Sequence, residues 1–326
     1  MKTKRVSKID WDFSVLGFGC WGASGKGNWT NHTDDDQIRA IQKAMALGIN
    51  FFDVAPIYGF GHAEEVLGKA IKGHRDEIFI ASKVGLPWTK DFDGYNDVSA
   101  KNIMREIDDS LKRLDVDYVD LYQVHWPTDK DVPLEETIEA MAKIKASGKA
   151  KYIGLSNYSI SDLEKASEIV EIASMQGLFN MLELDADAYH NIPLQYRVNS
   201  EVLPAVIEKG MAFLPYSPLF QGLLTGKITS ETVFGTNDVR NQNPKLQGKQ
   251  RLNHLKAIDE ILKLPALEGK AIAEVAVNYL VAKKGITSVI ATQANESEVL
   301  ANVKALEWEM SQETLLSIEK IVKEKL

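Results

Sequence analysis

Short apolar runs alternate with longer amphipathic segments along almost the whole chain, and this alternation constrains the fold more than any other feature. The runs are apolar on both faces, as buried parallel strands are. The longer segments have helix end signals, such as Thr33 before and Gly48 after residues 34–47. Strands are expected at residues 15–19, 49–55, 78–84, 118–124, 151–155, 172–176, 211–216 and 287–291.

Strand–helix alternation predicts parallel βαβ units. Eight such units within 326 residues match the size of a (β/α)8 TIM barrel, and a doubly wound open sheet is the alternative. The helices are expected at residues 34–47, 62–72, 99–113, 134–147, 160–171, 200–209, 251–263, 271–283, 295–304 and 312–324.

The ends of the chain add to this pattern. Residues 5–9 and 13–18 flank Asp10-Trp11-Asp12 and predict an N-terminal β-hairpin that leads into the first strand. The last helices are extra C-terminal helices beyond the barrel. No linker or low-complexity tract interrupts the chain, so residues 1–326 are expected to form one domain.

Two segments, residues 184–199 and 218–250, are longer than ordinary loops. Long loops at the catalytic end of a barrel usually shape a ligand site. For residues 184–199, a surface insertion without a role is the alternative.

Composition excludes several classes of partner. The chain has 38 basic and 46 acidic residues and a formal charge of −8, which argues against nucleic acid or an anionic membrane. Cys20 is the single cysteine, so no intrachain disulfide forms, as expected in the cytoplasm. The N-terminus has no apolar secretory segment, and no run of apolar residues is long enough to span a membrane.

Several catalytic motifs are present only in part. Gly17-Phe18-Gly19-Cys20-Trp21-Gly22 matches a dinucleotide fingerprint, but the residues after it form a poor helix. Gly154-Leu155-Ser156-Asn157 lacks the second glycine of a hydrolase nucleophile elbow. The six histidines are scattered without the close spacing of a zinc site. The sequence therefore predicts neither a Rossmann site, nor a serine hydrolase, nor a metal centre.

Four polar residues follow or end three successive predicted strands. Asp53 and Tyr58 follow residues 49–52, Lys83 comes directly after residues 78–82, and His125 follows residues 119–124. Each has an ordinary structural explanation when it is taken alone. Adjacent parallel strands lie about 4.8 Å apart, however, so a barrel brings all four to one rim.

These side chains suit proton transfer. A tyrosine with its reference pKa near 10 is a poor acid at neutral pH, and the Lys83 cation is expected to lower the pKa of Tyr58. Asp53 supplies the counter-charge that Lys83 needs if it is buried. His125 can donate a hydrogen bond to a substrate oxygen. None of the four supplies a hydride, so a cofactor must do so.

With these residues in place, the chain resembles the aldo-keto reductase family, in particular its bacterial members and the potassium-channel β subunits. The resemblance runs from the hairpin to the C-terminal helices. It rests on residues 52–59, 81–84, 122–127, 153–157 and 216–227. It implies that Asp53, Tyr58, Lys83 and His125 are the catalytic tetrad of an NAD(P)-dependent enzyme that interconverts aldehydes or ketones and alcohols, including sugars.

The resemblance also implies a set of cofactor-binding residues. Ser156, Asn157 and Gln176 match residues that hold the nicotinamide carboxamide, and Tyr216 matches the aromatic that stacks on the ring. The backbone of Ser217–Leu219 matches the loop that holds the pyrophosphate, and Asn302 matches an adenine contact. The remaining residues implied are Gly19, Cys20, Trp21, Gln221 and Glu298.

Two departures from the family pattern concern cofactor and substrate. Residues 290–302 contain no Lys or Arg, and Glu298 stands where an Arg that grips the 2′-phosphate of NADP is common. A carboxylate repels that phosphate but accepts hydrogen bonds from a ribose diol, so NAD is expected to serve at least as well as NADP. Residues 184–199 carry about a dozen residues beyond the family pattern, so the substrate cannot be inferred by analogy.

Three functions are compatible with these residues. The leading one is a carbonyl reductase or alcohol or sugar dehydrogenase, and the alternative is a redox-sensing regulatory subunit with little turnover. A barrel hydrolase or isomerase without nicotinamide is disfavoured by the pairing of Tyr58 with Lys83. The expected partner is a small carbonyl or alcohol bound among the loops at residues 23–32, 86–98, 184–199 and 218–250. The sequence does not indicate an oligomeric state.

Overall fold

Eight parallel strands form a nearly closed barrel in the computed structural model, which describes residues 1–25, 32–127, 132–236 and 238–326. The strand order is β11-β8-β7-β6-β5-β4-β3-β12. The strands are β3 (Leu16–Gly19), β4 (Phe51–Asp53), β5 (Phe79–Val84), β6 (Val119–Val124), β7 (Ala150–Ser156), β8 (Ile172–Leu178), β11 (Ala212–Tyr216) and β12 (Val289–Thr292).

The last strand returns to the first, because β12 pairs in parallel with β3. At the remaining seam, the Thr287 backbone N–H donates to the Phe213 oxygen at 2.9 Å, and the Phe213 N–H donates to Thr287 Oγ1 at 3.1 Å. The predicted TIM barrel is therefore confirmed, and the open doubly wound alternative is wrong.

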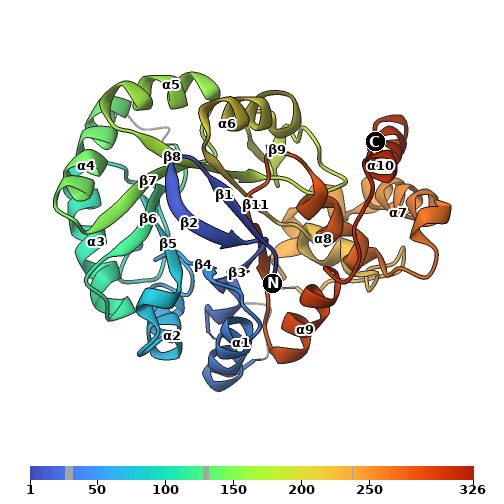
Figure 1. Ribbon diagram of the computed structural model, residues 1–326, viewed down its shortest axis with the longest axis horizontal. Helices are drawn as coiled ribbons and strands as arrows, with labels where there is room; N and C mark the ends of the chain where they lie inside the picture. Colours follow the sequence, from blue (N-terminus) through green and yellow to red (C-terminus); the bar gives the residue numbers. More distant parts are fainter. Residues whose placement is uncertain (26–31, 128–131, 237) are drawn as a thin grey trace.

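Helices surround the barrel (Figure 1). The predicted capping of α1 is confirmed: Thr33 Oγ1 accepts the Asp36 N–H at 3.2 Å, and Gly48 follows the helix with φ of 84°. The helices are α1 (Asp34–Ala46), α2 (His62–Ala70), α3 (Ala100–Leu114), α4 (Leu134–Ala146), α5 (Ile160–Ile169), α6 (Leu203–Lys209), α7 (Gly248–Leu262), α8 (Ile272–Ala282), α9 (Glu296–Lys304) and α10 (Gln312–Lys325).

A hairpin of β1 (Thr3–Val6) and β2 (Ile9–Ser14) covers one end of the barrel (Figure 1). Its turn is Ser7-Lys8, so the prediction that Asp10-Trp11-Asp12 separates the two strands is wrong. The three residues lie within β2 and alternate: both aspartates face solvent, whereas Trp11 packs on Phe79 with ring centroids 5.9 Å apart. Phe13 and Phe79 belong to the apolar cluster inside the barrel, which the hairpin therefore closes.

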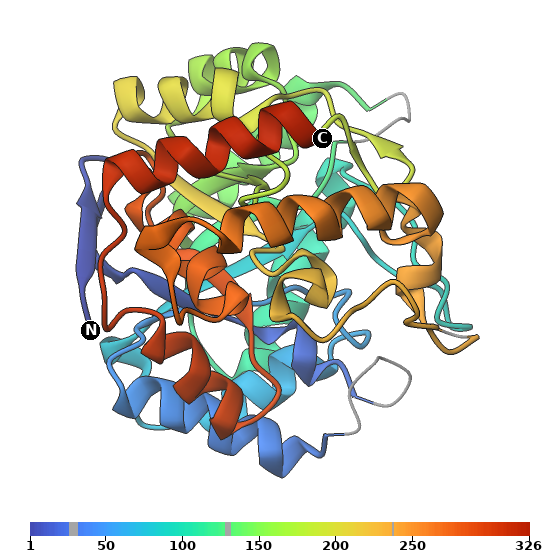
Figure 2. The same cartoon turned by 90° about the vertical axis from the view of Figure 1, so that its right-hand side faces the viewer.

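The long segment at residues 184–199 is not a plain loop. It forms a small hairpin of β9 (Ala188–Tyr189) and β10 (Ile192–Pro193), and a turn of π-helix at Val198–Val202 leads into α6. Residues 218–250 hold short 3-10 helices at Phe220–Thr225, Val239–Gln242 and Pro244–Leu246 before α7. Figure 2 shows α7 and α10 side by side, as extra cover outside the barrel.

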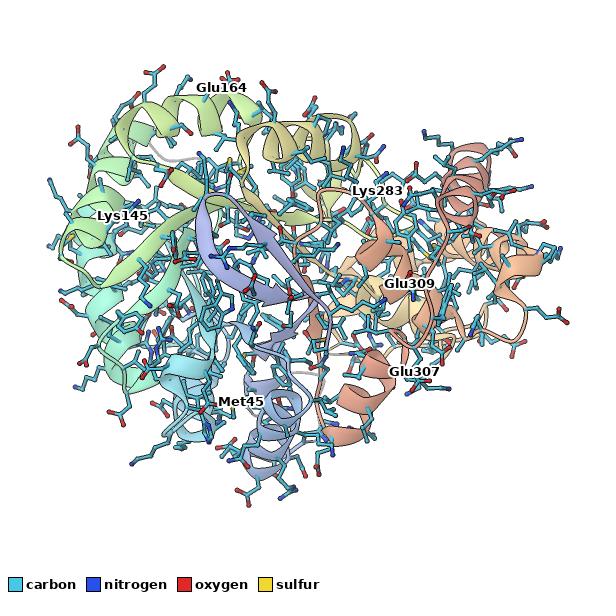
Figure 3. All side chains as sticks on the ribbon, viewed as in Figure 1. Met45, Lys145, Glu164, Lys283, Glu307 and Glu309 are labelled. Atoms are coloured by element: carbon cyan, nitrogen blue, oxygen red, sulfur yellow. The ribbon has the colours of Figure 1, made fainter. Side chains whose placement is uncertain are left out.

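Charged side chains project outward from the helical layer. Figure 3 labels Lys145, Glu164 and Glu307 among them. Within the described ranges, no helix has both the length and the apolar character needed to cross a membrane.

Candidate active site

The four predicted proton-transfer residues lie at the carboxyl end of three adjacent strands. Asp53 ends β4, Lys83 is the second-last residue of β5, and His125 follows β6. The strands β4, β5 and β6 pair in this order, so the register brings these residues to one rim. Tyr58 follows β4 in a turn in which its N–H donates to the Ala55 oxygen at 3.1 Å.

The Lys83 ammonium is the centre of this group. Its Nζ atom donates to Asp53 Oδ1 at 2.6 Å, to the Val54 backbone oxygen at 3.1 Å and to the Tyr58 hydroxyl at 3.2 Å. These three bonds use all three donors of the ammonium. Burial lowers the pKa of Lys83, but Asp53 and then Tyr58 raise it by more, so the net pKa is above its ordinary value and the amine stays charged.

Tyr58 differs from the expectation in one respect. Burial raises its pKa to about 12, and the Lys83 cation lowers the pKa without outweighing burial. The effect of Lys83 thus has the predicted direction, but the net shift is upward because the phenolate loses more hydration than one shared cation restores. In this state Tyr58 is a protonated phenol at neutral pH.

His125 is the second hydrogen-bonding group at this rim. Burial and then the Lys83 charge hold its pKa well below the ordinary value, so the imidazole is neutral. Its ring centroid lies 5.9 Å from that of Tyr58, and Trp21 contacts Tyr58 edge-on at 5.0 Å. A neutral imidazole keeps one N–H donor for a substrate oxygen placed between His125 and Tyr58.

Gln176 joins the tetrad to the neighbouring strands. Its Nε2 donates to Asp53 Oδ2 at 2.9 Å, so both Asp53 oxygens are occupied within the protein. The carboxylate accepts only, which fixes the orientation of the amide and leaves Gln176 Oε1 available as an acceptor. Sequence reasoning placed Gln176 in the cofactor site but did not foresee this contact with the tetrad.

The residues predicted to lie around the nicotinamide also come together. Asn157 Nδ2 donates to Ser156 Oγ at 3.1 Å and to the His125 backbone oxygen at 3.1 Å. The Tyr216 hydroxyl donates to Asn157 Oδ1 at 2.8 Å. These residues end or follow β7 and β11, on either side of Gln176 in β8.

The loop after β11 has an unusual backbone. Ser217, Phe220 and Gln221 have φ of 56°, 46° and 50°, and Gly222 follows with φ of 94°. Two N–H groups are used within the loop, since Phe220 donates to the Ser217 oxygen and Gly222 donates to the Leu219 oxygen, both at 3.0 Å. Leu219, whose backbone belongs to the predicted pyrophosphate segment, lies within this loop.

The other predicted cofactor residues end or follow β3, or lie in the helix after β12. Gly19 ends β3, and a Cβ there would approach Ile290 Cγ2 to 3.0 Å. The thiol of Cys20 is buried, so only its backbone is available for a ligand. Glu298 and Asn302 lie in α9, where the Glu298 carboxylate accepts the Ala294 N–H at 2.8 Å. Two of these residues adjoin the tetrad: Gly19 is the parallel partner of Asp53 in the pair β3–β4, and Trp21 packs on Tyr58.

Residues 184–199 were predicted to be one of the substrate loops, but the side chains that they contribute at this mouth were not. Tyr189 of β9 lies edge-on to Tyr216 at 5.6 Å and packs beside Trp126 at 6.0 Å. His190 Nε2 accepts a hydrogen bond of 2.6 Å from Gln221 Nε2. The aromatic residues within this otherwise polar segment were the available signal, since aromatic side chains seldom remain exposed.

Contacts with residues 218–250 hold the segment in place. Lys245 Nζ lies 2.6 Å from Glu183 Oε1, and it also donates to the Ala188 oxygen at 2.8 Å. Within residues 218–250, Asn243 Nδ2 donates to Gln221 Oε1 at 2.9 Å and so fixes the amide that bonds to His190. The predicted substrate loops 184–199 and 218–250 are therefore joined to each other, whereas part of the predicted loop 23–32 lies outside the described residues.

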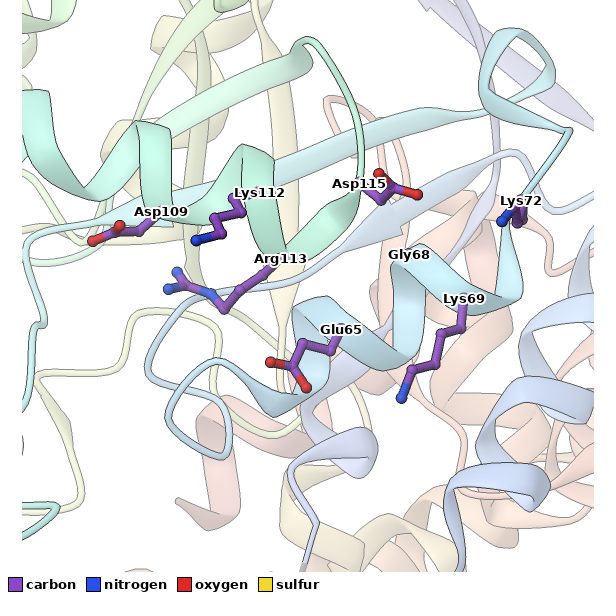
Figure 4. A pocket seen from close by; sticks show the side chains of 8 residues that line it. All are labelled: Glu65, Gly68, Lys69, Lys72, Asp109, Lys112, Arg113 and Asp115. Atoms are coloured by element: carbon purple, nitrogen blue, oxygen red, sulfur yellow. The ribbon is translucent and has the colours of Figure 1, made fainter.

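A surface hollow elsewhere does not belong to this site. It lies between α2 and α3 and carries charges of both signs (Figure 4). Its lining residues include none of the predicted catalytic or cofactor residues: they are Glu65, Gly68, Lys69, Lys72, Asp109, Lys112, Arg113 and Asp115. Among the described residues, no cluster of three or more His, Cys, Asp or Glu is placed to hold a metal ion.

Comparison with known proteins agrees with this geometry. The model of the aldo/keto reductase family matches residues 15–323. The aldo-keto reductase YhdN of Bacillus subtilis is 33% identical, with 99% of this chain and 94% of that protein covered. The NADH-specific methylglyoxal reductase of Escherichia coli is 28% identical over 95% of both chains. A probable voltage-gated potassium channel subunit beta of Arabidopsis thaliana is 30% identical over 94% of this chain and 92% of that protein.

A solved structure shows the same architecture. The glycerol dehydrogenase AKR11B4 from Gluconobacter oxydans superposes with a TM-score of 0.87 and 30% identity, covering 100% of this chain and 96% of that chain. Both the bacterial relatives and the channel subunits named in the resemblance are thus confirmed as relatives. The chain belongs to the aldo-keto reductase family, whose members are oxidoreductases that use NAD(P)H.

Proposed function

We propose that this protein interconverts aldehydes or ketones and alcohols, including sugars, with Tyr58 as the general acid in reduction and the general base in oxidation. The observation that carries the proposal is the contact of Lys83 Nζ with both Asp53 and the Tyr58 hydroxyl. A buried phenol bonded to a lysine has few structural uses, because each polar group costs free energy to bury. Placed at a barrel mouth, the pair suits proton transfer to an alkoxide.

The residues fit a nicotinamide cofactor. Gln176 Oε1 has a free lone pair for the amide N–H of the carboxamide, and the Ser156 hydroxyl has a hydrogen to donate to its oxygen. The ring of Tyr216 stands beside them, and the positive-φ residues of the next loop suit the pyrophosphate. When bound, the reduced nicotinamide supplies a hydride to the carbonyl carbon and is itself oxidised.

The chain's own residues then handle the proton and the oxygen. The neutral His125 donates a hydrogen bond to the carbonyl oxygen and orients it toward Tyr58. As negative charge develops on that oxygen, the Tyr58 hydroxyl gives up its proton and the Lys83 ammonium stabilises the phenolate that remains. Oxidation runs these steps in reverse, and the phenolate takes the proton of the alcohol.

The choice between NAD(H) and NADP(H) depends on Glu298, at the part of the site predicted to bind adenosine. The Glu298 carboxylate is held at the start of α9 by its hydrogen bond with the Ala294 N–H. Our proposal is that it accepts hydrogen bonds from the adenosine ribose, so NAD(H) serves at least as well as NADP(H). The similarity to the NADH-specific methylglyoxal reductase of Escherichia coli supports this assignment. A cytoplasmic location stays a prediction.

Replacing Tyr58 by Phe tests the function. The Tyr58→Phe protein is expected to lose roughly 10²–10⁴-fold in kcat with a panel of aldehydes, ketones and polyols, while the Kd of the reduced cofactor stays within about twofold, because only one hydroxyl is removed. Tyr279→Phe is the matched control, since Tyr279 is buried in α8 and its hydroxyl donates to Glu319. Wild-type turnover in Tyr58→Phe would exclude Tyr58 as the acid.

The alternative is a redox-sensing regulatory subunit, which is favoured by the match with channel β subunits. In that case the wild-type protein would bind the reduced cofactor tightly, oxidise it only slowly with every carbonyl in the panel, and respond little to Tyr58→Phe. Single-turnover oxidation of the bound cofactor separates the two functions, because a subunit of this kind oxidises its cofactor without multiple turnovers.

A further inference from the structure

Asn157 is the most fully bonded polar side chain at the mouth of the barrel. Its Nδ2 donates to the His125 oxygen and to Ser156 Oγ, both at 3.1 Å. Its Oδ1 accepts from the Tyr196 hydroxyl and from the Tyr216 hydroxyl, both at 2.8 Å. An amide has two N–H donors and two oxygen lone pairs, so all four positions are used within the protein.

The orientation of this amide is fixed. The His125 backbone oxygen only accepts, so Nδ2 must face it, and Oδ1 must then face the two phenols. Asn157 is also buried, and its φ of 65° lies in the left-handed region that asparagine tolerates better than most residues. As placed here, every donor and acceptor of the side chain has a partner within the protein.

Tyr196 reaches this amide from the segment at residues 184–199. Its hydroxyl donates to Asn157 Oδ1 and accepts the Leu178 backbone N–H at 3.1 Å. Its ring lies against Gly177 of β8, where any Cβ would stand 3.2 Å from a ring carbon. The fit of the Tyr196 ring on a glycine, with both hydrogen-bonding roles of the hydroxyl used, shows a built contact between this segment and the barrel.

We propose that Tyr196 is a positioning residue of the nicotinamide site and that Asn157 is the amide through which it acts. The inference rests on the proposed function and assigns a role to residues 184–199. Tyr196 holds Asn157 Oδ1, and Asn157 in turn fixes the Tyr216 hydroxyl, the Ser156 hydroxyl and the backbone of His125. The carboxamide is then bound beside this amide, at Ser156 and Gln176, and Tyr196 acts by fixing the orientation of Asn157.

Two variants test this role. Tyr196→Phe removes one donor to Asn157 Oδ1 but also leaves the Leu178 N–H without its acceptor. Tyr216→Phe removes the other donor, keeps the aromatic ring and keeps the hydrogen bond from the Leu178 N–H to the Tyr196 hydroxyl. Tyr279→Phe is again the matched control, because it removes one hydrogen bond of a buried tyrosine, 2.9 Å in length, away from the barrel mouth.

The readouts separate positioning from stability. Single-turnover hydride transfer is expected to fall about fivefold to tenfold in Tyr196→Phe and in Tyr216→Phe, the effect of one lost hydrogen bond. The Kd of NADH is expected to change less than about twofold, because the contacts with pyrophosphate and adenosine remain. The near-ultraviolet circular dichroism of bound NADH, which reports nicotinamide orientation without turnover, is expected to change in the same way in both variants.

The controls distinguish failure of the role given to Tyr196 from failure of the proposed function. Tyr279→Phe is expected to lower Tm while hydride transfer and the dichroism of bound NADH stay as in the wild type. If Tyr196→Phe does the same, Tyr196 is only structural and this inference is overturned. If Tyr58→Phe keeps wild-type turnover, the proposed function fails, while the dichroism of bound NADH still decides the role of Tyr196. If the wild type binds neither NADH nor NADPH, both fail.

Discussion

Lys83 and Asp53 form an ion pair in which neither side chain is more than 4% exposed, with Nζ and Oδ1 2.6 Å apart. A buried pair of this kind is weak evidence for stability, because desolvation offsets the attraction, but the loss of one partner is costly. Its position beside the Tyr58 hydroxyl suits the pair to proton transfer. Replacement of Lys83 separates the effect of the pair on stability from its effect on activity.

Replacing Lys83 by Met is expected to destabilise the protein by about 3–5 kcal/mol, because Asp53 then stays buried with only Gln176 as a donor. Reductase activity is expected to fall by roughly 10² or more, because the phenolate of Tyr58 loses its cation. The double variant Asp53→Asn/Lys83→Met removes the orphaned charge. Urea unfolding should show most of the stability restored in the double variant, whereas activity stays absent; recovery of activity would contradict the role given to Lys83.

The raised pKa of Tyr58, about 12, predicts different pH profiles for carbonyl reduction and alcohol oxidation. Reduction needs the protonated phenol, which prevails at every pH below that value, so its kcat/KM should be flat between about pH 7 and 10. Oxidation needs the phenolate, whose fraction rises about tenfold per pH unit below the pKa. Measured profiles should therefore rise with pH for alcohol oxidation only. A flat oxidation profile over the same interval would show that Tyr58 is not the base.

Coenzyme choice is predicted to depend on Glu298. The kcat/KM with NADH should equal or exceed that with NADPH, and a hundredfold preference for NADPH would refute the proposal. Glu298→Arg should raise kcat/KM for NADPH roughly tenfold or more, since one charge-assisted hydrogen bond is worth about 1.5 kcal/mol or more. Glu296→Arg is the matched control, because Glu296 is exposed in the same turn of α9. An equal gain in both variants would indicate a general effect of charge.

Glu106 predicts how stability depends on pH. Burial raises its pKa from 4.5 to about 7, although the Gly85 N–H donates to its Oε2 at 2.9 Å. The folded state therefore binds the proton more tightly than the unfolded chain does. Its contribution to stability is fully present below about pH 4.5 and is lost as the pH rises to about 7, by at most about 1.4 kcal/mol per pH unit.

Glu106→Gln should flatten this part of the stability profile, because the amide does not ionise and keeps an acceptor for Gly85. Urea unfolding between about pH 4 and 8 measures the slope. Glu135→Gln, at an exposed position of α4, is expected to leave the slope unchanged. If the slope persists in Glu106→Gln, the titration belongs to another group.

The strand positions show how much of the fold the local pattern of apolar and polar residues predicts. Runs such as residues 211–216 are apolar on both faces, and only a strand covered on both sides buries such a run, so β11 was predictable to within a residue. The hairpin turn was placed wrongly because Asp10 and Asp12 resemble turn residues. Only contact with the barrel floor shows that Trp11 between them points inward.

The sequence by itself determined the alternation of eight strands with helices and the polar residues at the strand ends, whereas closure into a barrel was decided by the pairing of β12 with β3. Periodicity and the position of polar residues at strand ends are local properties, and parallel strands bring their carboxyl ends to one rim. Only the tertiary structure decided the net pKa of Tyr58, because burial depends on every element that covers it. It alone also joined Tyr196 to Asn157, since residues 39 positions apart meet only when the segment after β8 folds back on Gly177. Contacts of that range leave no periodic pattern in a single chain.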